Sequence, residues 1–441
     1  MARGAFSSSW WVGSAAVAAT AAVVSVGTVA SAAAPLRFGN PDGKLGTLST
    51  LGPIDSRHPF FQPLGPTGRA CSSCHDPSAG WSLSPALAEQ RFAASGGLDP
   101  LFRPHDGANS PAADTSTVAA RRLAYSMLLR RGVFRIGLPV PQGAELTLVT
   151  ADDPYGHASA SELSLFRRPL PAANLQLTSR VMWDGRDTQE GGSLEQSLLK
   201  QALGALQGHH QIGSPDPAVV EQLVRFEGSL VAAQEADRRA GALGKSKGKG
   251  GAAKLAKQLS SAKVPEMTDF KLFQAWKKGK SGKARNRAAI ARGEKLFNAH
   301  RFTVSDVRGF NDVLGQPVVS ATCSSCHQAP DGASRRFQEM DLGVSAGTRR
   351  APEQPLYTFR HTFTGEVRST TDPGRALVTG KWDDMDKFKV PSLRGLASRP
   401  PYLHDGSAAD LDAVVQFYED RFRLQLTAKQ RSDLLAFLRS L

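Results

Sequence analysis

The pentapeptide Cys71-Ser72-Ser73-Cys74-His75 occurs a second time as Cys323-Ser324-Ser325-Cys326-His327, and the two copies hold all four cysteines of the chain. Two thiols three positions apart can bond to the two vinyl groups of one porphyrin, and the adjoining histidine then lies beneath the iron as its proximal ligand. A structural zinc site is the alternative, but its ligands are usually closer together in sequence. We therefore predict two covalent haem c groups, with His75 and His327 as iron ligands.

The spacing of the two motifs indicates two domains. They begin 252 positions apart in a chain of 441 residues, too far for one small domain. The chain contains 42 Gly and 27 Pro and has few alternating apolar runs, which is typical of helices joined by long loops. The predicted fold is therefore mostly α, with two cytochrome c-like haem domains, long loops and a few short strands, one of them near Leu146 to Thr150.

Two helices are expected to close the domains. Asp216-Pro217 has the pattern of a helix start, and Thr427 and Gln430 have capping-box spacing before a leucine-rich run to the chain end. The predicted boundaries are a signal peptide at 1–33, an N-terminal haem domain at 34–237, a basic low-complexity linker or loop at 238–285, and a C-terminal haem domain at 286–441.

Positive charge is concentrated in one segment. The chain has 54 Lys and Arg against 40 Asp and Glu, a formal charge of +14. Sixteen of the basic residues lie between Arg238 and Arg292, where the acidic residues are only Glu266 and Asp269. We expect no nucleic-acid binding, because the excess does not belong to a folded reading surface. This segment is either a solvated, flexible surface or a docking surface for an acidic partner or an anionic membrane.

The N-terminus has the pattern of a cleavable secretory signal. Arg3 precedes an Ala- and Val-rich run from Val12 to Val29, and Ala30-Ser31-Ala32 supplies the small residues that signal peptidase requires. A retained membrane anchor is the alternative, although the run is weakly apolar for a membrane span. No other stretch is long and apolar enough to cross a bilayer, so the mature protein is expected in the periplasm.

Three further segments carry a family resemblance: Met182-Trp183-Asp184-Gly185-Arg186, the stretch Phe388 to Arg394, and the stretch Pro401 to Gly406. With them, the chain resembles the bacterial di-haem cytochrome c peroxidase and MauG superfamily over nearly all of its mature length. The segment from Arg167 to Asn174 resembles a longer branch of it. The resemblance implies that the first haem reacts with peroxide and the second transfers electrons, with Trp183 as the relay between them.

The resemblance also suggests the distal ligand of the second haem. In the superfamily this ligand follows the histidine of the Pro401 to Gly406 block by fourteen residues, which here is Tyr418. Peroxidases carry Met at this position and MauG carries Tyr. Leu411, Val414, Val415 and Tyr418 share one helical face, so Tyr418 is expected to point inward, as a ligand or as a core residue. Met385 is the alternative ligand.

The distal side of the first haem departs from the superfamily pattern. Gln201 corresponds to its conserved Gln, but no carboxylate stands where its acid–base Glu is expected. His209 and His210 occupy that neighbourhood instead. A histidine can accept and return a proton near neutral pH. His209 and His210 are therefore interpreted as a proton shuttle, an iron ligand or surface residues.

An inter-haem calcium ion, which the resemblance implies, is doubtful here. The positions of its Asn side chain and Thr carbonyl are occupied by Arg168 and Arg399, although the Pro401 carbonyl is retained. A guanidinium can supply positive charge in place of the ion. Arg394 is predicted to pair with a haem propionate, and His404 to support the second haem.

The leading hypothesis is a periplasmic di-haem peroxidase that reduces hydrogen peroxide at the His75 haem with electrons entering through the His327 haem. A small periplasmic electron donor of the cytochrome c or cupredoxin type is the expected partner. The first alternative is a MauG-like oxidase acting on a protein substrate. The second is a non-catalytic two-haem electron carrier.

Overall fold

The computed structural model describes residues 34–260 and 268–441, so the predicted signal peptide at 1–33 lies outside the described residues. The described part contains twelve α-helices and thirteen strands. The helices are α1 (Pro85–Ser95), α2 (Val118–Ala124), α3 (Ser126–Arg131), α4 (Leu194–Gly208), α5 (Pro217–Ser229), α6 (Ala252–Leu259), α7 (Gly282–Ala299), α8 (Asn311–Leu314), α9 (Cys323–Cys326), α10 (Ala376–Thr379), α11 (Leu411–Phe422) and α12 (Ala428–Leu438).

The strands form five small antiparallel sheets in the described residues, ordered β1-β2-β6-β7, β12-β11-β4, β3-β5, β8-β9 and β10-β13. They are β1 (Leu36–Asn40), β2 (Gly43–Ser49), β3 (Phe134–Leu138), β4 (Leu146–Asp152), β5 (Leu163–Arg167), β6 (Leu230–Asp237), β7 (Gly241–Ala242), β8 (Phe302–Ser305), β9 (Val318–Ala321), β10 (Glu339–Met340), β11 (Leu356–His361), β12 (Val367–Thr370) and β13 (Phe388–Lys389).

The fold is therefore mixed, and the prediction of a mostly α chain was wrong. The strand near Leu146 is present as β4, but most other strands have no alternating apolar pattern. β6, for example, reads Leu-Val-Ala-Ala-Gln-Glu-Ala-Asp. Its Ala, Gln and Glu favour a helix, yet it pairs along its length with β2, and this tertiary pairing overrides local propensity.

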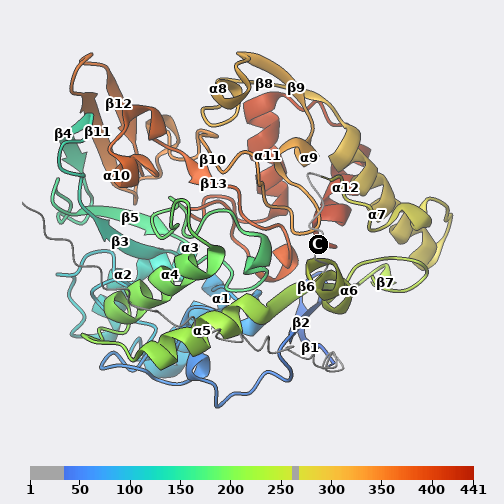
Figure 1. The fold of residues 1–441 in the computed structure, drawn as a ribbon, viewed down its shortest axis with the longest axis horizontal. Coiled ribbons are helices and arrows are strands. Elements are labelled where there is room, and N and C mark those ends of the chain that lie inside the picture. The colour runs from blue at the N-terminus through green and yellow to red at the C-terminus, as the bar shows by residue number, and fades with distance from the viewer. Residues whose placement is uncertain (1–33, 261–267) are drawn as a thin grey trace, which may run out of the picture. The chain divides into compact units, whose positions relative to one another are not determined.

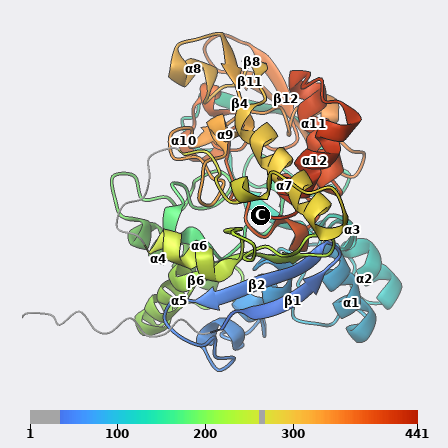
Figure 2. The ribbon, with the colours of Figure 1, turned by 90° about the vertical axis from the view of Figure 1, so that its right-hand side faces the viewer.

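The two halves of the chain share structure. β4 pairs with β11 from the second half, and Figure 1 shows these strands side by side with β12. β6 lies in one sheet with β1 and β2 (Figure 2), and its Gln234 amide donates to the carbonyl of Leu441 at the chain end, at 3.0 Å. Backbone hydrogen bonds thus join the segments 34–237 and 286–441. Their division into two separate haem domains remains a prediction.

The two helix starts predicted from the sequence are confirmed. Asp216 caps α5 by accepting from the Ala218 amide, and Thr427 and Gln430 form the capping box of α12. Helix α12 packs on α7, and both join α11 around one hydrophobic core, with Phe437 and Leu441 fully buried. In Figure 1 these three helices gather beside α9, which carries the second pentapeptide.

The segment 238–285 differs from the expected exposed linker. In its described part it contains β7 and α6, and Leu243, Phe273 and Trp276 are buried in the core shared with α7 and α12. These residues are buried because apolar side chains are spaced among the lysines of the segment. The low-complexity stretch around Gly250 hid this spacing in the sequence. No helix among the described residues has the length and apolarity needed to cross a membrane.

Candidate active site

A first cavity surrounds the first pentapeptide. Cys71, Cys74 and His75 line it. Neither cysteine forms a disulfide. Gln201 from α4 and the following His209 and His210 line the same cavity. The structure therefore brings the three predicted distal residues to the pentapeptide.

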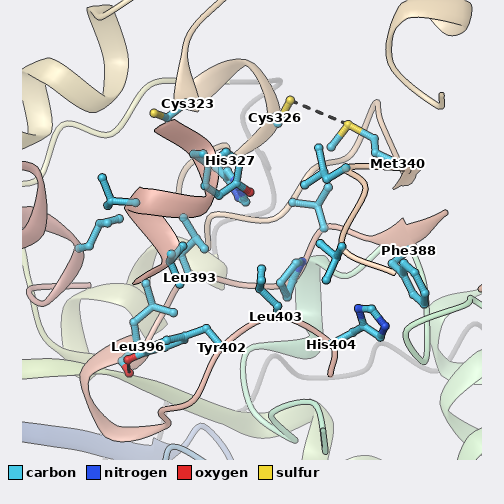
Figure 3. A pocket seen from close by; sticks show the side chains of 18 of the residues that line it. Cys323, Cys326, His327, Met340, Phe388, Leu393, Leu396, Tyr402, Leu403 and His404 are labelled. Atoms are coloured by element: carbon cyan, nitrogen blue, oxygen red, sulfur yellow. Dashed lines mark hydrogen bonds between the residues drawn. The ribbon is translucent and has the colours of Figure 1, made fainter. Parts of the chain in front are cut away.

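A second cavity surrounds the second pentapeptide on α9. Cys323, Cys326 and His327 line it together with Tyr418 of α11, and the cysteines again form no disulfide. Figure 3 shows the two sulfur atoms and the His327 ring at one side of this cavity and His404 at the other. His404 is buried and stacks on Phe388, with 4.0 Å between ring centroids.

The two proximal histidines are oriented in the same way. His75 Nδ1 lies 3.1 Å from the Trp81 carbonyl oxygen, and His327 Nδ1 lies 2.9 Å from that of Gly332. A carbonyl accepts only from N–H, so these contacts leave Nε2 of each ring as the free, unprotonated nitrogen. Burial lowers the pKa of both histidines, which favours the neutral imidazole. This is the arrangement of a metal-ligating histidine, so both sites fit a covalently attached haem.

Tyr418 points inward, as its helical face predicts. It stacks on Phe422, with 6.1 Å between ring centroids, and burial raises its pKa. Its hydroxyl forms no hydrogen bond with any described residue, although Tyr418 lines the second cavity. Tyr418 is partly buried, so its hydroxyl is free to bind a group in the cavity.

Met385 and Met340 differ in whether they line the second cavity. Met385 is fully buried in a separate core cluster with Trp382 and does not line the second cavity. Met340 does line it, with its sulfur atom 4.0 Å from that of Cys326 (Figure 3). The structure therefore replaces Met385 by Met340 as the thioether available to the second site.

Trp183 lies in the wall between the two cavities and lines both. Its indole Nε1 donates to the Arg168 carbonyl at 2.8 Å, and its own carbonyl accepts from the Lys389 amide at 2.8 Å. Arg168 and Lys389 also line both cavities. The wall thus contains one aromatic ring and two cationic side chains, and Pro169, Pro171 and Ser392 also line both cavities.

A buried ion-pair network supports this wall. Asp184, which follows Trp183, pairs with Arg167 and, at 3.1 Å, with Arg186. Although burial opposes its charge, the Arg167 and Arg186 guanidinium groups lower the pKa of Asp184 to about 2. Arg167 also forms a bidentate pair with Asp372 at 2.7 and 2.8 Å. The network links the Trp183 motif to a residue almost two hundred positions away.

His209 is held at the edge of the first cavity by a carboxylate that the sequence analysis missed. Its Nδ1 lies 2.7 Å from Asp106 Oδ2, and its side chain is 41% exposed. Asp106 is buried and also binds Arg69, at 2.6 Å. Burial by itself would raise the pKa of Asp106. Hydrogen bonds from His105 and His209, together with the charge of Arg69, instead hold this pKa well below its usual range. No sequence pattern connects these residues.

His210 has a different environment. It is buried, its Nδ1 has no partner, and its Nε2 lies 3.9 Å from the Cys71 sulfur atom. Burial, with the nearby charges of His209 and Arg69, lowers the pKa of His210 to about 4. It is therefore neutral at neutral pH, whereas His209 forms a hydrogen bond with Asp106.

A carboxyl group does line the first cavity, contrary to the expectation from the distal segment. Glu227 comes from α5, and burial raises its pKa to about 8. It follows Val220, Leu223 and Val224 on the apolar face of that helix, at the i+7, i+4 and i+3 positions. A charged residue within an apolar stripe was the signal that could have revealed it.

Arg394 lies outside both cavity linings. It is buried, donates from Nε to the Pro330 carbonyl at 2.6 Å, and lies over the Phe270 ring at 5.3 Å. Its pairing with a propionate remains a prediction. Arg168, Arg399 and Pro401, the positions implied for calcium, all line the second cavity.

No family model matches the chain. The chain is 24% identical over 286 residues to cytochrome-c peroxidase IdrP1 of Pseudomonas sp. (strain SCT), a match that covers 60% of this chain and 64% of that protein. It is 24% identical over 293 residues to the methylamine utilization protein MauG of Methylophilus methylotrophus, covering 64% and 70%.

The chain is homologous to cytochrome c peroxidases and MauG. The named peroxidase relatives are oxidoreductases, and the relationship implies a haem c cofactor. The crystal structure of a MauG-like protein associated with microbial copper homeostasis aligns with 92% of the chain, at 15% identity and a TM-score of 0.39. Asp106, Glu227 and Met340 are the site residues that the structure adds to those predicted from the sequence.

Proposed function

We propose that the protein is a periplasmic di-haem c-type peroxidase that reduces hydrogen peroxide at the first cavity with electrons that enter through the second. The observation that carries this proposal is the position of Trp183, which lines both cavities. Bound haem supplies the redox-active iron, attached through Cys71 and Cys74 in one site and through Cys323 and Cys326 in the other. His75 and His327 supply the proximal nitrogens.

The residues of the first cavity handle protons. Reduction of one peroxide molecule to two waters consumes two electrons and two protons. His209, anchored through Nδ1 to Asp106, presents Nε2 as an acid or base at a constant orientation. Glu227 remains protonated at neutral pH and holds a second transferable proton at the cavity wall. Gln201 contributes a neutral amide that orients peroxide without competing for a proton.

Trp183 carries charge between the sites. An indole ring can give up and regain an electron, whereas an aliphatic side chain at the same place cannot. Its hydrogen bond to the Arg168 carbonyl keeps the ring in the wall. The electron donor is a small acidic protein that docks near the second cavity.

Helix α7 supports this docking site. Lys283, Arg285 and Lys295 of this helix are exposed, while Phe297 is buried and lines the second cavity. Electrostatic docking weakens as salt screens the charges. We expect reduction by a small acidic cytochrome or cupredoxin to slow with ionic strength, and the double change Lys283→Glu with Arg285→Glu to slow it at low salt. A salt-independent rate contradicts this site.

The activity is tested by rapid mixing of the two-haem protein with peroxide. The expected result is a spectral change at the first haem followed by oxidation of the second. An electron carrier without turnover gives neither. Electron paramagnetic resonance distinguishes the two: a high-spin ferric signal altered by cyanide requires an accessible iron, and its absence in both the oxidised and half-reduced forms refutes the peroxidase.

A MauG-like oxidase acting on a protein substrate is the second candidate, and the unpartnered hydroxyl of Tyr418 favours it. A phenolate ligand lowers the reduction potential of the second haem, whereas the Met340 thioether raises it. Tyr418→Phe and Met340→Leu form a matched pair. An altered spectrum of the second haem only in Tyr418→Phe supports the oxidase, and one only in Met340→Leu removes its support.

A further inference from the structure

The wall between the cavities contains three cationic side chains that form no ion pair with a described residue: Arg168 is buried, and Lys389 and Arg399 are partly buried. Arg168 is 6% exposed, donates from Nη2 to the carbonyls of Leu83 and Arg399 at 2.7 and 3.3 Å, and leaves Nη1 without a partner. Arg399 likewise leaves Nε buried and unpartnered. Lys389 donates only to neutral oxygens, the hydroxyl of Thr178 at 2.7 Å and the carbonyl of Arg180 at 2.6 Å.

The neighbouring arginines of the same region are paired. Arg167 binds Asp184 and Asp372, and Arg180 binds Glu339 at 2.7 Å. In the described part of the chain, no such ion pair exists for Arg168, Lys389 or Arg399. The unpaired cations therefore form a distinct set within an otherwise neutralised region.

Burial of unpaired positive charge is unfavourable. Burial lowers the pKa of Arg168 to about 9, and repulsion from Arg399 adds to the shift. A buried charge without a partner costs several kcal/mol unless an anion compensates it. Asp331 and Glu339 lie close enough to Lys389 to favour its charge, but no carboxylate of the described residues does so for Arg168 or Arg399. We therefore expect the anion that compensates the Arg168 charge to come from the cavities.

The three cations differ in what they face. Arg168 and Lys389 line both cavities, whereas Arg399 lines only the second. We infer that Arg168 and Lys389 form one anion site that binds a carboxylate from the occupant of each cavity, and that Arg399 binds the occupant of the second alone. On the proposed function these carboxylates are haem propionates. The cationic side chains then supply positive charge at the place where the family resemblance implies a calcium ion.

The site has an electrostatic consequence for both haems. A positive charge close to a haem disfavours its oxidised, more positive state, so it raises the reduction potential. Loss of the shared Arg168 charge must lower both potentials, and loss of Arg399 only that of the second haem.

The experiment is a spectroelectrochemical titration of the full two-haem protein and of Arg168→Gln, Arg399→Gln and Arg168→Lys. We expect Arg168→Gln to shift both potentials to more negative values, Arg399→Gln to shift only the second, and Arg168→Lys to remain close to wild type. A shift of one potential or none in Arg168→Gln, with both haems attached, overturns the inference. If Arg168→Gln does not accumulate, Lys389→Gln is measured in its place. We expect Lys389→Gln to shift both reduction potentials, and a shift of one or none overturns the inference.

Calcium removal is the second readout. Treatment with a calcium chelator should leave both wild-type potentials unchanged, and a shift would show that a metal ion provides the charge instead. Haem content separates this inference from the proposed function. Fewer than two haems per chain refutes the di-haem function. If both haems are attached but their reduction potentials do not shift together in Arg168→Gln, only the shared anion site is refuted.

Discussion

At the level of single residues, His209 and His210 are neighbours in sequence with different chemical capacities. His209 is anchored by Asp106 and is partly exposed, while His210 is buried with an unpartnered nitrogen. A pair of this kind allows proton transfer to be separated from simple occupancy of the cavity, because each residue serves as the control for the other.

We expect His209→Ala to slow the reaction with peroxide on the order of 100-fold or more, the range of general acid–base catalysis. His210→Ala should have a much smaller effect, since His210, with its pKa lowered to about 4, is neutral at working pH. Stopped-flow rates from pH 5 to 8 provide the measurement. Equal losses in the two variants contradict the assigned roles.

Glu227 gives a pH dependence to stability. Its pKa of about 8 in the folded chain exceeds the ordinary value of 4.5, so between these values the folded state binds more protons than the unfolded state. Stability contributed by this group therefore falls as pH rises from 4.5 to about 8, by roughly 3 to 5 kcal/mol in total.

The measurement is thermal or denaturant unfolding as a function of pH. Glu227→Gln should flatten the decline across this interval, because the neutral amide has no proton to lose. Glu221→Gln is the matched control, since Glu221 lies on the exposed face of the same helix. An unchanged slope in Glu227→Gln shows that another group determines the pH dependence.

At the level of elements, helices position the site and their ends are locally encoded. α12 begins at a Thr427 cap whose hydroxyl accepts from the Gln430 amide at 3.3 Å, and its apolar face packs on α7. α7 in turn places Phe297 at the second cavity. The cap thus contributes to the position of a wall of the site.

Thr427→Ala should lower the free energy of unfolding by about 1 kcal/mol, because one backbone amide at the helix start loses its acceptor. Chemical denaturation with haem spectra recorded in parallel provides the measurement. Thr427→Ser, which keeps the hydroxyl, is the control and should stay within a few tenths of a kcal/mol of wild type. If Thr427→Ser lowers the free energy of unfolding as much as Thr427→Ala does, the capping role of Thr427 is contradicted.

At the level of the whole molecule, Trp183 is one of the places where the two halves of the chain meet. Trp183 belongs to the first half, its carbonyl binds Lys389 of the second, and its ring faces His404 with 6.2 Å between centroids. The strand pairing of β4 with β11 holds the halves at a constant separation. On the proposed function, charge transfer between the cavities therefore depends on the assembled chain.

Trp183→Phe should preserve the initial reaction of the first haem with peroxide and slow oxidation of the second by an order of magnitude or more. Trp382→Phe is the control, because Trp382 is buried in a separate core cluster and lines neither cavity. Double-mixing spectroscopy of the half-reduced protein resolves the two steps. An unchanged second step excludes Trp183 as the relay.

The haem-attachment motifs, the helix caps and the inward face of α11 could be predicted because each depends on residues within a few positions of one another. Cys71 and His75 meet through a single turn, and Leu411 and Tyr418 share a face through helical periodicity alone. The same local logic predicted β4 but missed strands such as β6, whose side chains favour another conformation.

Tertiary structure alone decided which distant groups meet. Asp106 reaches His209, Glu227 reaches the first cavity, and Met340 rather than Met385 reaches the second. Each of these encounters joins segments separated by long loops, and the free energy that determines them comes from burial and pairing across the whole chain. Local sequence holds no record of such partners, because the partner of a buried charge is chosen by the fold around it.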